Sequence, residues 1–320
     1  MTRSRKLLIA VPCLALIVII AAAFVRHLHW DQRVFYWFST ISFAPSTPSE
    51  AVGLGDFGAT IEAKRIDGVD DNLSGITFDP ERQQLWAVVN APSLLLGISL
   101  EGELLSRHTL EGFHDVEGVT YLGNDRLALV EERRQTIIVM PVPALSGALK
   151  RDDFIDLRFD LHPEENNEYE GLTYDAIADR LLIAKERDPL LLYQIGDFAG
   201  KEQDRFALDV KDVTHTQGGG IFLDDVAGLA FDPHTSHLLA LSHESRLLVE
   251  LDGQGDVISY LLLEAGHANL TADVPQGEGV TLDDQGRLYL VSEPNLFYRF
   301  ERPRADDKNS TNGAAAGSAR

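Results

Sequence analysis

The sequence is poor in cysteine and in basic residues. Its 320 residues include one cysteine, Cys13, so no disulfide can form within the chain and cysteine usage does not fix the redox compartment. Lys and Arg total 28 against 50 Asp and Glu, which gives a formal net charge of −22. A surface this acidic repels nucleic acid and anionic lipid and attracts cations. We therefore expect no nucleic-acid partner.

Long helical periodicity is absent from residues 60–300, which argues against α/β folds. One long apolar run is present at the N-terminus, where Leu7–Val25 gives nineteen residues without a charge. That length falls in the range of about 17–25 residues for a membrane-spanning helix. Arg3, Arg5 and Lys6 precede the run, and basic residues favour the cytoplasmic side. We expect a signal anchor over residues 1–30 that crosses the inner membrane once, with the rest of the chain in the periplasm.

The alternative is a cleaved signal peptide, for which Ala21-Ala22-Ala23 offers a small-residue cleavage site. The length of the apolar run favours the uncleaved anchor. Residues 31–59 contain Pro45 and Pro48 and are expected to form a juxtamembrane segment and tether. An aromatic group in this region suits the far membrane interface, and it consists of Trp30, Phe35, Tyr36, Trp37 and Phe38.

A short motif with a central glycine recurs five times along the rest of the chain. In each copy a small residue or a carboxylate precedes the glycine and an alternating apolar run follows it. The glycines are 43, 53, 57 and 51 residues apart. A repeat of this length is typical of a supersecondary unit that buries its apolar face only against its neighbours. The five motifs are Ser74–Phe78, Glu117–Tyr121, Glu170–Tyr174, Ala227–Phe231 and Glu278–Leu282.

A second apolar run follows each glycine by nine or ten residues, after turn formers such as Asp79-Pro80. Two short β-type runs separated by turn residues indicate a hairpin. These second runs are Leu85–Val89, Leu127–Val130, Leu181–Ala184, Leu238–Leu241 and Leu288–Val291. Third strands are expected at Leu94–Leu100, Thr136–Val142, Leu190–Ile195, Leu247–Leu251 and Leu296–Phe300. Fourth strands are expected at Leu104–Leu110, Phe154–Leu161, Arg205–Val210 and Val257–Leu263.

The last repeat has no fourth strand of its own, because residues 303–320 are polar or small and are expected to form a disordered tail. A strand-like run, Thr60–Ile66, instead precedes the first repeat. If this early strand completes the last unit, the ring closes without exposed sheet edges. We therefore predict an all-β fold over residues 60–302, a five-bladed β-propeller with circular closure by the N-terminal strand, preceded by one transmembrane helix.

Carboxylates recur at two positions of this repeat. In a four-stranded blade the innermost strand begins, and the second strand ends, on the same face of the disc, so both positions face one mouth of the central channel. The residues before the glycines are Ser74, Glu117, Glu170, Ala227 and Glu278. The residues after the second strands are Asn90, Glu132, Glu186, His243 and Glu293.

Six carboxylates at one mouth repel one another unless several are protonated or a cation lies among them. Oxygen ligands without cysteine suit a hard cation, which favours Ca²⁺ over Zn²⁺. The expected ligand set is Glu117, Glu170, Glu278, Glu132, Glu186 and Glu293, with Asn90 adding a carbonyl oxygen. Asp115, Glu168 and Asp225, each three residues before its glycine, are second-rank candidates.

Two simpler interpretations stay open. Single glutamates at loop ends are usually solvated and pair with nearby basic residues, here Arg126, Arg133, Lys185 or Arg187. The glycines are explained by close packing of the blades near the axis, and we assign them no chemistry.

His243 is a weak candidate for a catalytic group. Its neighbours Glu244 and Ser245 supply a carboxylate and a hydroxyl, but side chains of adjacent residues diverge along a strand. At the channel mouth the glutamates are expected to raise the pKa of His243, and the imidazole would serve as a general base.

The repeated Glu-Gly-Val/Leu-Thr-Tyr/Leu strand, the Ser/Lys-Glu end of the second strand and the N-terminal apolar run resemble the SdiA-regulated (YjiK-like) bacterial family. The resemblance covers residues 56–302 together with the apolar run. It implies a five-bladed propeller distantly similar to NHL-repeat proteins, with a calcium site near Glu117, Glu170 and Glu278. Ser74 and Ala227 depart from the acidic pattern and leave the ligand set open.

We therefore predict a membrane-anchored, extracytoplasmic calcium-binding propeller with a binding or envelope-associated role. One alternative is a calcium-dependent hydrolase of esters, lactones or phosphoesters, in which the metal polarises the substrate and His243 or a displaced glutamate acts as base. Another is a protein-interaction module that uses its loops and holds no metal. The sequence does not identify the substrate, the protein partner or the oligomeric state.

Overall fold

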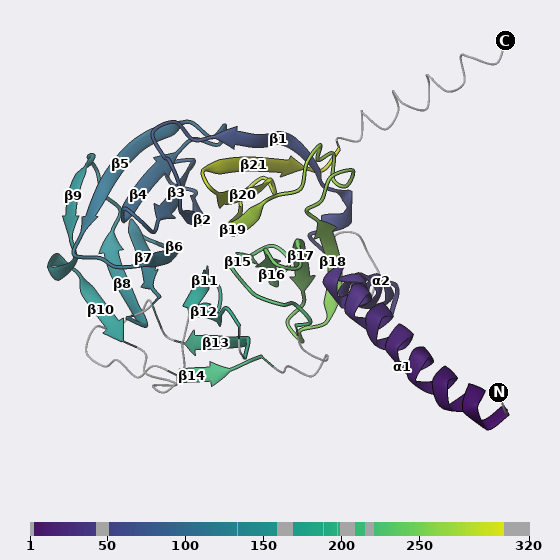
Figure 1. Cartoon of the computed structure of the whole chain (residues 1–320). Coiled ribbons are helices and arrows are strands. Elements are labelled where there is room, and N and C mark those ends of the chain that lie inside the picture. Colours follow the sequence, from purple (N-terminus) through teal and green to yellow (C-terminus); the bar gives the residue numbers. More distant parts are fainter. Residues whose placement is uncertain are drawn as a thin grey trace, which may run out of the picture.

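Five β-sheets stand around a central axis in the computed structural model of the chain (Figure 1). The structure describes residues 3–42, 51–132, 134–158, 169–187, 189–196, 198, 209–214 and 221–303. The five-bladed β-propeller predicted from the repeats is confirmed. The predicted tail beyond residue 303 lies outside the described residues.

In blades 1 to 4 the strands run outward from the pore in sequence order. Blade 1 holds β2 (Leu73–Asp79), β3 (Gln84–Val89), β4 (Leu94–Ile98) and β5 (Leu104–Glu111). Blade 2 holds β6 (Val116–Gly123), β7 (Arg126–Glu131), β8 (Thr136–Pro141) and β10 (Ile155–Arg158). Blade 3 holds β11 (Tyr169–Asp175), β12 (Arg180–Lys185), β13 (Leu191–Gly196) and β14 (Asp209–Asp212). Blade 4 holds β15 (Gly228–Asp232), β16 (His237–Ser242), β17 (Leu247–Leu251) and β18 (Val257–Leu262).

Blade 5 closes the ring as the sequence predicts. It contains β19 (Gln276–Leu282), β20 (Leu288–Glu293) and β21 (Leu296–Glu301), and its outer strand is β1 (Gly58–Arg65) from the start of the domain. β1 pairs antiparallel with β21, with Gly58 opposite Glu301 and Arg65 opposite Leu296. The two ends of the propeller therefore hold each other in one sheet.

One strand is absent from the sequence prediction. β9 (Gly147–Lys150) leaves blade 2 and pairs in parallel with the outer strand β5 of blade 1. The chain then returns through the 3-10 turn Arg151–Asp153 to β10. The fourth strands of blades 2 and 3 were predicted over longer ranges, and residues 159–161 and 205–208 of those ranges lie outside the described residues.

The apolar core lies between neighbouring blades. Trp86 and Val88 of blade 1 pack with Leu127 and Leu129 of blade 2 in one buried cluster. A similar cluster joins blade 5 to blade 1 and includes Tyr289, at 0% exposure. Each blade therefore buries its faces against its two neighbours, and closure of the ring covers the faces of the first and last blades.

The repeated glycines allow the innermost strands to approach one another. A Cβ atom on Gly75 would lie 2.6 Å from the carbonyl oxygen of Glu117, and one on Gly118 would lie 2.6 Å from that of Glu170. At the closure, a Cβ on Gly279 would lie 2.9 Å from the carbonyl oxygen of Ser74. These contacts are with backbone atoms, so a side chain does not fit, which agrees with the packing explanation of the glycines.

The threonine two residues after the glycine joins one blade to the next. The Oγ1 atom of Thr77 accepts a hydrogen bond from the backbone amide of Tyr121 at 3.1 Å. Thr281 does the same for Phe78 at 3.2 Å, across the closure of the ring. The recurring Gly-x-Thr sequence thus supplies both the close approach and the hydrogen bond between blades.

Two helices precede the propeller. α1 covers Arg3–His27 and α2 covers Trp30–Ser42. Among the residues that the structure describes, no helix is long and apolar enough to cross a membrane, so the predicted transmembrane helix is not supported. Within the predicted span, the side chains of residues 7–12 and 15 lie outside the described part of the chain.

The region expected to be a juxtamembrane segment and tether is partly folded onto the propeller. α2 packs against β18, and Tyr36 is fully buried in the core of blade 4. Val52, Leu54 and Phe57 join the core between blades 4 and 5. Residues 43–50 lie outside the described residues.

Candidate site at the pore mouth

The structure gathers the predicted side chains at one mouth of the pore. Glu170 interacts electrostatically with four other glutamates, from blades 2, 3 and 5. His243 of blade 4 interacts with Glu186, Glu278 and Glu293. Asn90 of blade 1 reaches Glu117 through a hydrogen bond. The seven predicted ligand positions and His243 therefore form one group, which we call the mouth cluster: Asn90, Glu117, Glu132, Glu170, Glu186, His243, Glu278 and Glu293.

A β-bulge places the inner glutamates. In β6 the pairing with β7 shifts register between Val116 and Gly118, and β11 and β19 shift at the same point of the repeat. Glu117, Glu170 and Glu278 are the residues inside these shifts. A bulge turns the side chain of the extra residue away from the regular alternation of the strand. The glycine beside it makes the bulge possible next to the neighbouring blade, so the motif directs its carboxylate toward the pore.

Glu117 is oriented by blade 1. One carboxylate oxygen accepts a hydrogen bond from Oγ of Ser74 at 2.6 Å, and the other accepts one from Nδ2 of Asn90. Ser74 and Asn90, the non-acidic residues of blade 1, thus orient the carboxylate of Glu117 in blade 2. Asn90 was predicted to offer an oxygen to a metal, and here its amide nitrogen donates to Glu117.

Glu170 lies at the electrostatic centre of the cluster. Burial raises its pKa well above the usual value, and the charges of Glu186, Glu278, Glu117 and Glu132 raise it further. Burial alone disfavours a carboxylate anion, and four like charges add to that cost. The side chains that interact with Glu170 therefore create an excess of negative charge around it.

Glu278 of blade 5 is also in an environment that disfavours its charged form. Burial raises its pKa to about 8, although a hydrogen bond from Gln276 and the charge of His243 both act in the opposite direction. The Nε2 atom of Gln276 donates to Oε1 of Glu278 at 2.7 Å. The pKa of Glu293 is also raised, first by burial and then by Asp71.

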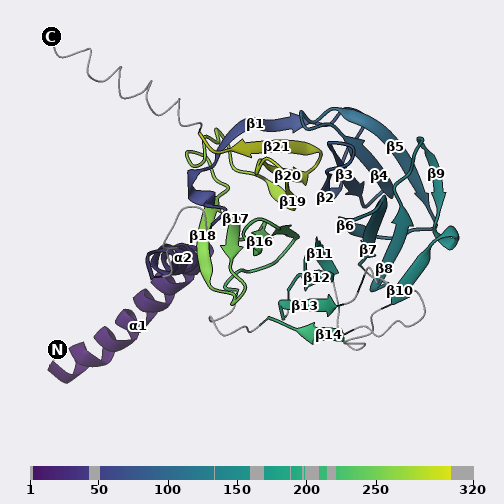
Figure 2. The same cartoon turned by 180° about the vertical axis from the view of Figure 1, so that it is seen from behind.

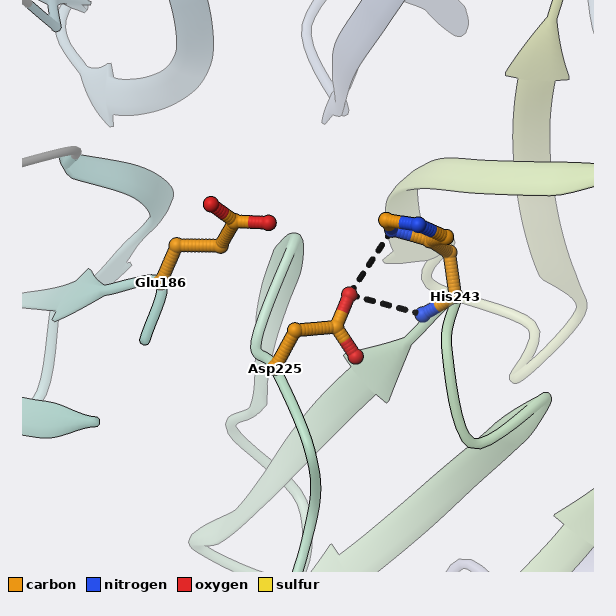
Figure 3. Close-up of side chains that lie close together, drawn as sticks. All are labelled: Glu186, Asp225 and His243. Atoms are coloured by element: carbon orange, nitrogen blue, oxygen red, sulfur yellow. Dashed lines mark hydrogen bonds and ion pairs between the residues drawn. The ribbon is translucent and has the colours of Figure 1, made fainter. Parts of the chain in front are cut away.

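His243 is held by Asp225, as Figure 3 shows. Its Nδ1 atom lies 2.7 Å from Oδ2 of Asp225, and its backbone amide donates to the same oxygen at 3.2 Å. The other oxygen of Asp225 accepts hydrogen bonds from the hydroxyl of Ser242 and from the backbone amide of Glu244. Asp225 is fully buried, and the donors at the end of β16 and in the loop that follows it compensate its carboxylate.

Glu186, Asp225 and His243 each offer one ligand atom within 4.8 Å of the others. Two oxygens on opposite sides of a Ca²⁺ ion are separated by about 4.8 Å, so the spacing alone admits an ion. The chemistry argues otherwise, because each oxygen of Asp225 already faces two donors, which occupy both of its lone pairs. Asp225 also raises the pKa of His243, and an imidazolium is not a metal ligand. We therefore assign Asp225 to the orientation of His243.

Glu186 has a basic partner at the edge of the cluster. Nε of Arg187 lies 2.9 Å from Oε2 of Glu186, and NH1 of Arg187 lies 2.7 Å from Glu244. Lys185 instead donates to the backbone carbonyl of Arg187 at 2.7 Å. Glu186 is thus paired with a basic residue, but its side chain is only 2% exposed, so this is not a solvated pair. The raised pKa values of Glu170 and Glu278 are caused first by burial.

Below the inner glutamates the pore narrows to a ring of glycines. The cavity there leaves about 10 Å³ for the centre of a water molecule. A single water needs about that much, so the passage admits nothing larger. The lining residues include Gly75, Gly118, Gly228, Gly279, Glu170 and Glu278. Any ligand of the mouth cluster therefore enters from the open side.

The sequence indicates Asp225 as a candidate because it lies three residues before its glycine. It ranks below the glutamates in that prediction. Asp115 occupies the same position in blade 2, where its carbonyl accepts from the backbone amide of Glu132 at 2.9 Å. Glu168, the third such residue, lies outside the described residues.

The family comparison agrees with the predicted resemblance. A family model described as SdiA-regulated matches residues 49–301, which is most of the chain and includes every residue of the mouth cluster.

Solved structures with similar folds differ greatly in sequence. A chain of a nidogen/laminin complex is 16% identical, with 70% of this chain and 73% of that chain covered and a TM-score of 0.46. A luciferin-regenerating enzyme is 15% identical, with coverage of 77% and 80% and a TM-score of 0.47. Virginiamycin B lyase from Staphylococcus aureus is 11% identical, with coverage of 78% and 76% and a TM-score of 0.41.

Proposed function

This chain belongs to the SdiA-regulated family, and from that premise and the geometry of the pore we propose that it is a calcium-binding β-propeller. The ion is held at the mouth cluster by Glu117, Glu170 and Glu278, with further oxygens from the outer glutamates. The biochemical role is binding or envelope-associated.

The environment of Glu170 carries the proposal. A half-buried carboxylate faced by four others is unfavourable in the protein alone, as its raised pKa indicates. A divalent cation removes this cost, because it is attracted by all five charges at once. The formal net charge of −22 adds a long-range attraction for cations.

The donor set selects the kind of ion. Carboxylate oxygens from three blades suit a hard cation that accepts six to eight oxygen ligands in flexible geometry. Hydrogen bonds from Ser74 and Gln276 fix the orientations of Glu117 and Glu278. Such fixed orientation lowers the entropy that ion binding has to overcome.

Thermal unfolding of the full chain in calcium or in chelator tests this proposal. Because calcium binds the folded state alone, its addition should stabilise that state and raise the Tm. At a calcium concentration one hundred times the Kd, the free energy of unfolding should increase by about 2.7 kcal/mol. Glu170→Gln should abolish the shift. Glu101→Gln is the matched control, because Glu101 lies at the rim with its side chain 64% exposed, and it should keep the full shift.

An unchanged Tm in calcium would contradict the proposal. If a protein partner were then captured by the wild-type chain and lost when loops at the mouth are altered, the metal-free interaction module would replace it.

One observation favours a second function, the calcium-dependent hydrolase. In the neutral form of His243, Nδ1 faces Asp225 at 2.7 Å and Nε2 can accept a proton at the pore mouth. A bound calcium ion supplies polarisation of a carbonyl or phosphoryl oxygen. His243 would accept the proton of the attacking water, and Asp225 would stabilise the imidazolium that forms.

Turnover of model esters, lactones and phosphoesters tests the hydrolase. Activity should be lost in chelator and in His243→Ala, and it should survive in His234→Ala, since His234 is 68% exposed. Turnover that survives His243→Ala would contradict this mechanism.

We also propose that the N-terminal segment holds the propeller at the periplasmic side of the inner membrane. The support is the uncharged run Leu7–Val25 after three basic residues. In the described part of α1, residues 16–20 expose large apolar side chains. Membranes washed with alkaline carbonate should retain the chain, and release by the wash would contradict the anchoring.

A further inference from the structure

α2 is folded with its apolar face outward. Five apolar side chains at helical spacing form one stripe, and each is between 54% and 63% exposed. The opposite face is buried and includes Gln32, Tyr36 and Ser39. A helix on a soluble domain normally buries its apolar stripe and exposes its polar face. The outward residues, which we call the α2 stripe, are Trp30, Val34, Trp37, Phe38 and Ile41.

The inner face of α2 is firmly attached to blade 4. The Tyr36 ring packs 6.1 Å from that of Tyr260 on β18, and the Phe35 ring lies 5.3 Å from that of Phe222. Arg33 forms an ion pair with Glu264. The direction of the α2 stripe is therefore fixed by the propeller and does not result from a loosely attached helix.

The junction between the helices is attached as well. His29 has a φ of 53°, a left-handed conformation that ends the regular path of α1. Nδ1 of His29 and NH2 of Arg26 lie 2.9 and 3.2 Å from the carboxylate of Asp224. α1 thus leaves the propeller at a defined point, beside the residue that precedes Asp225.

We infer that the α2 stripe lies in the headgroup region of a lipid bilayer and holds the rim of blade 4 against the membrane. Trp side chains with aliphatic neighbours are typical of this region, where an apolar ring meets water. The stripe is continuous in sequence with the exposed apolar side chains of α1, such as Ile17 and Phe24. This inference rests on the proposed membrane attachment and adds the surface that makes the contact.

The arrangement of the helices fits this occupant. Figure 2 looks down the pore and shows α2 nearly end-on at the rim while α1 runs away from the disc. One bilayer can accommodate both helices if α2 lies in the interface and α1 leaves the interface in another direction. With the rim on the membrane, the pore axis lies along the bilayer and the mouth cluster opens to the side, where ions and solutes arrive from the aqueous phase.

Tryptophan fluorescence provides a direct test, because the chain has three tryptophans. Trp30 and Trp37 belong to the α2 stripe, whereas Trp86 is 2% exposed in the core of blades 1 and 2. The full chain is reconstituted in phosphatidylcholine vesicles that carry bromine at a shallow or a deep acyl position. In Trp30→Phe, the emission of Trp37 should be quenched, and more by the shallow bromine, because an interfacial helix enters only about 5–10 Å.

A charge on the stripe supplies the matched comparison. Val34→Glu should reduce the quenching of Trp37 and leave the Tm unchanged, because Val34 is 61% exposed. Leu105→Glu, at an exposed apolar position in blade 1, should leave the quenching unchanged.

Two results would overturn the inference. If the chain resists carbonate extraction but Trp37 is not quenched, the membrane attachment stands and the α2 stripe does not contact lipid. If Trp37 is shielded from aqueous iodide but is not quenched by bromolipid, a second copy of the chain covers the stripe instead. Loss of the chain in the carbonate wash marks failure of the membrane attachment itself.

Discussion

Nδ1 of His243 lies 2.7 Å from Oδ2 of Asp225 at the mouth of the pore. The carboxylate also binds the backbone of the loop that carries the histidine, so the imidazole and its partner are positioned as one unit. The arrangement resembles the base-and-orienting-group pairs of enzymes in its geometry. It also means that the charge of His243 depends on Asp225 more than on the glutamates around it.

Asp225→Asn should lower the pKa of His243. The largest cause of the raised pKa is the contact with Asp225, while burial acts against it. NMR titration of the imidazole in the variant and in the wild type should show the decrease. An unchanged His243 would contradict the assigned role of Asp225.

The same pair affects stability as a function of pH. Because folding raises the pKa of His243, its contribution is complete below the unfolded value of 6.5 and is lost as the pH rises through the folded value. In His243→Gln, denaturant unfolding from pH 6 to 9 should show a weaker loss of stability than in the wild type. If the free energy of unfolding falls equally with pH in both proteins, folding does not raise the pKa of His243.

Glu278 should make the chelated protein less stable at high pH. Folding raises its pKa from 4.5 to about 8, so the folded state binds the extra proton and stability falls as the pH rises through this interval. Glu278→Gln resembles the protonated form and should be more stable than the wild type at pH 9 in chelator, by roughly 2 kcal/mol. With calcium present the order should reverse, because the variant has lost a ligand.

Gly118→Ala should destabilise the propeller. The added Cβ would lie 2.6 Å from the carbonyl oxygen of Glu170, and neither backbone can withdraw without disturbing two blades. Overpacking of this kind costs about 1–3 kcal/mol. Gly147→Ala is the control, because nothing lies within 4 Å of its added Cβ. Equal midpoints in denaturant unfolding would contradict the packing explanation.

The sequence predicts the ring because its signals are local. The spacing of the five glycines and the strand Thr60–Ile66 determine the blades and their closure, and the structure has both. The same periodicity places Glu117 and Glu170 at one mouth without any knowledge of contacts. Thr77, Thr173 and Thr281 each accept a hydrogen bond from the next blade, whereas blade 4 has Ala230 at this position.

Features that depend on a distant partner are not visible in the sequence. β9 pairs with β5 some forty residues earlier, through four residues without a strong strand pattern. α2 has an apolar stripe that a sequence pattern would assign to the core, whereas the buried side is the one with Tyr36. Asp225 and Asp115 hold the same position of the repeat, but Asp225 is fully buried beside the imidazole of His243, which the sequence places eighteen residues away.

The mouth cluster is tested most directly by calorimetric titration of the chelator-treated full chain with calcium. We expect saturable binding with about one ion per chain, weakened in Glu117→Gln and abolished when Glu170→Gln and Glu278→Gln are combined. Binding that is absent from the wild type, or that persists unchanged in the double variant, would contradict a calcium site at the mouth cluster.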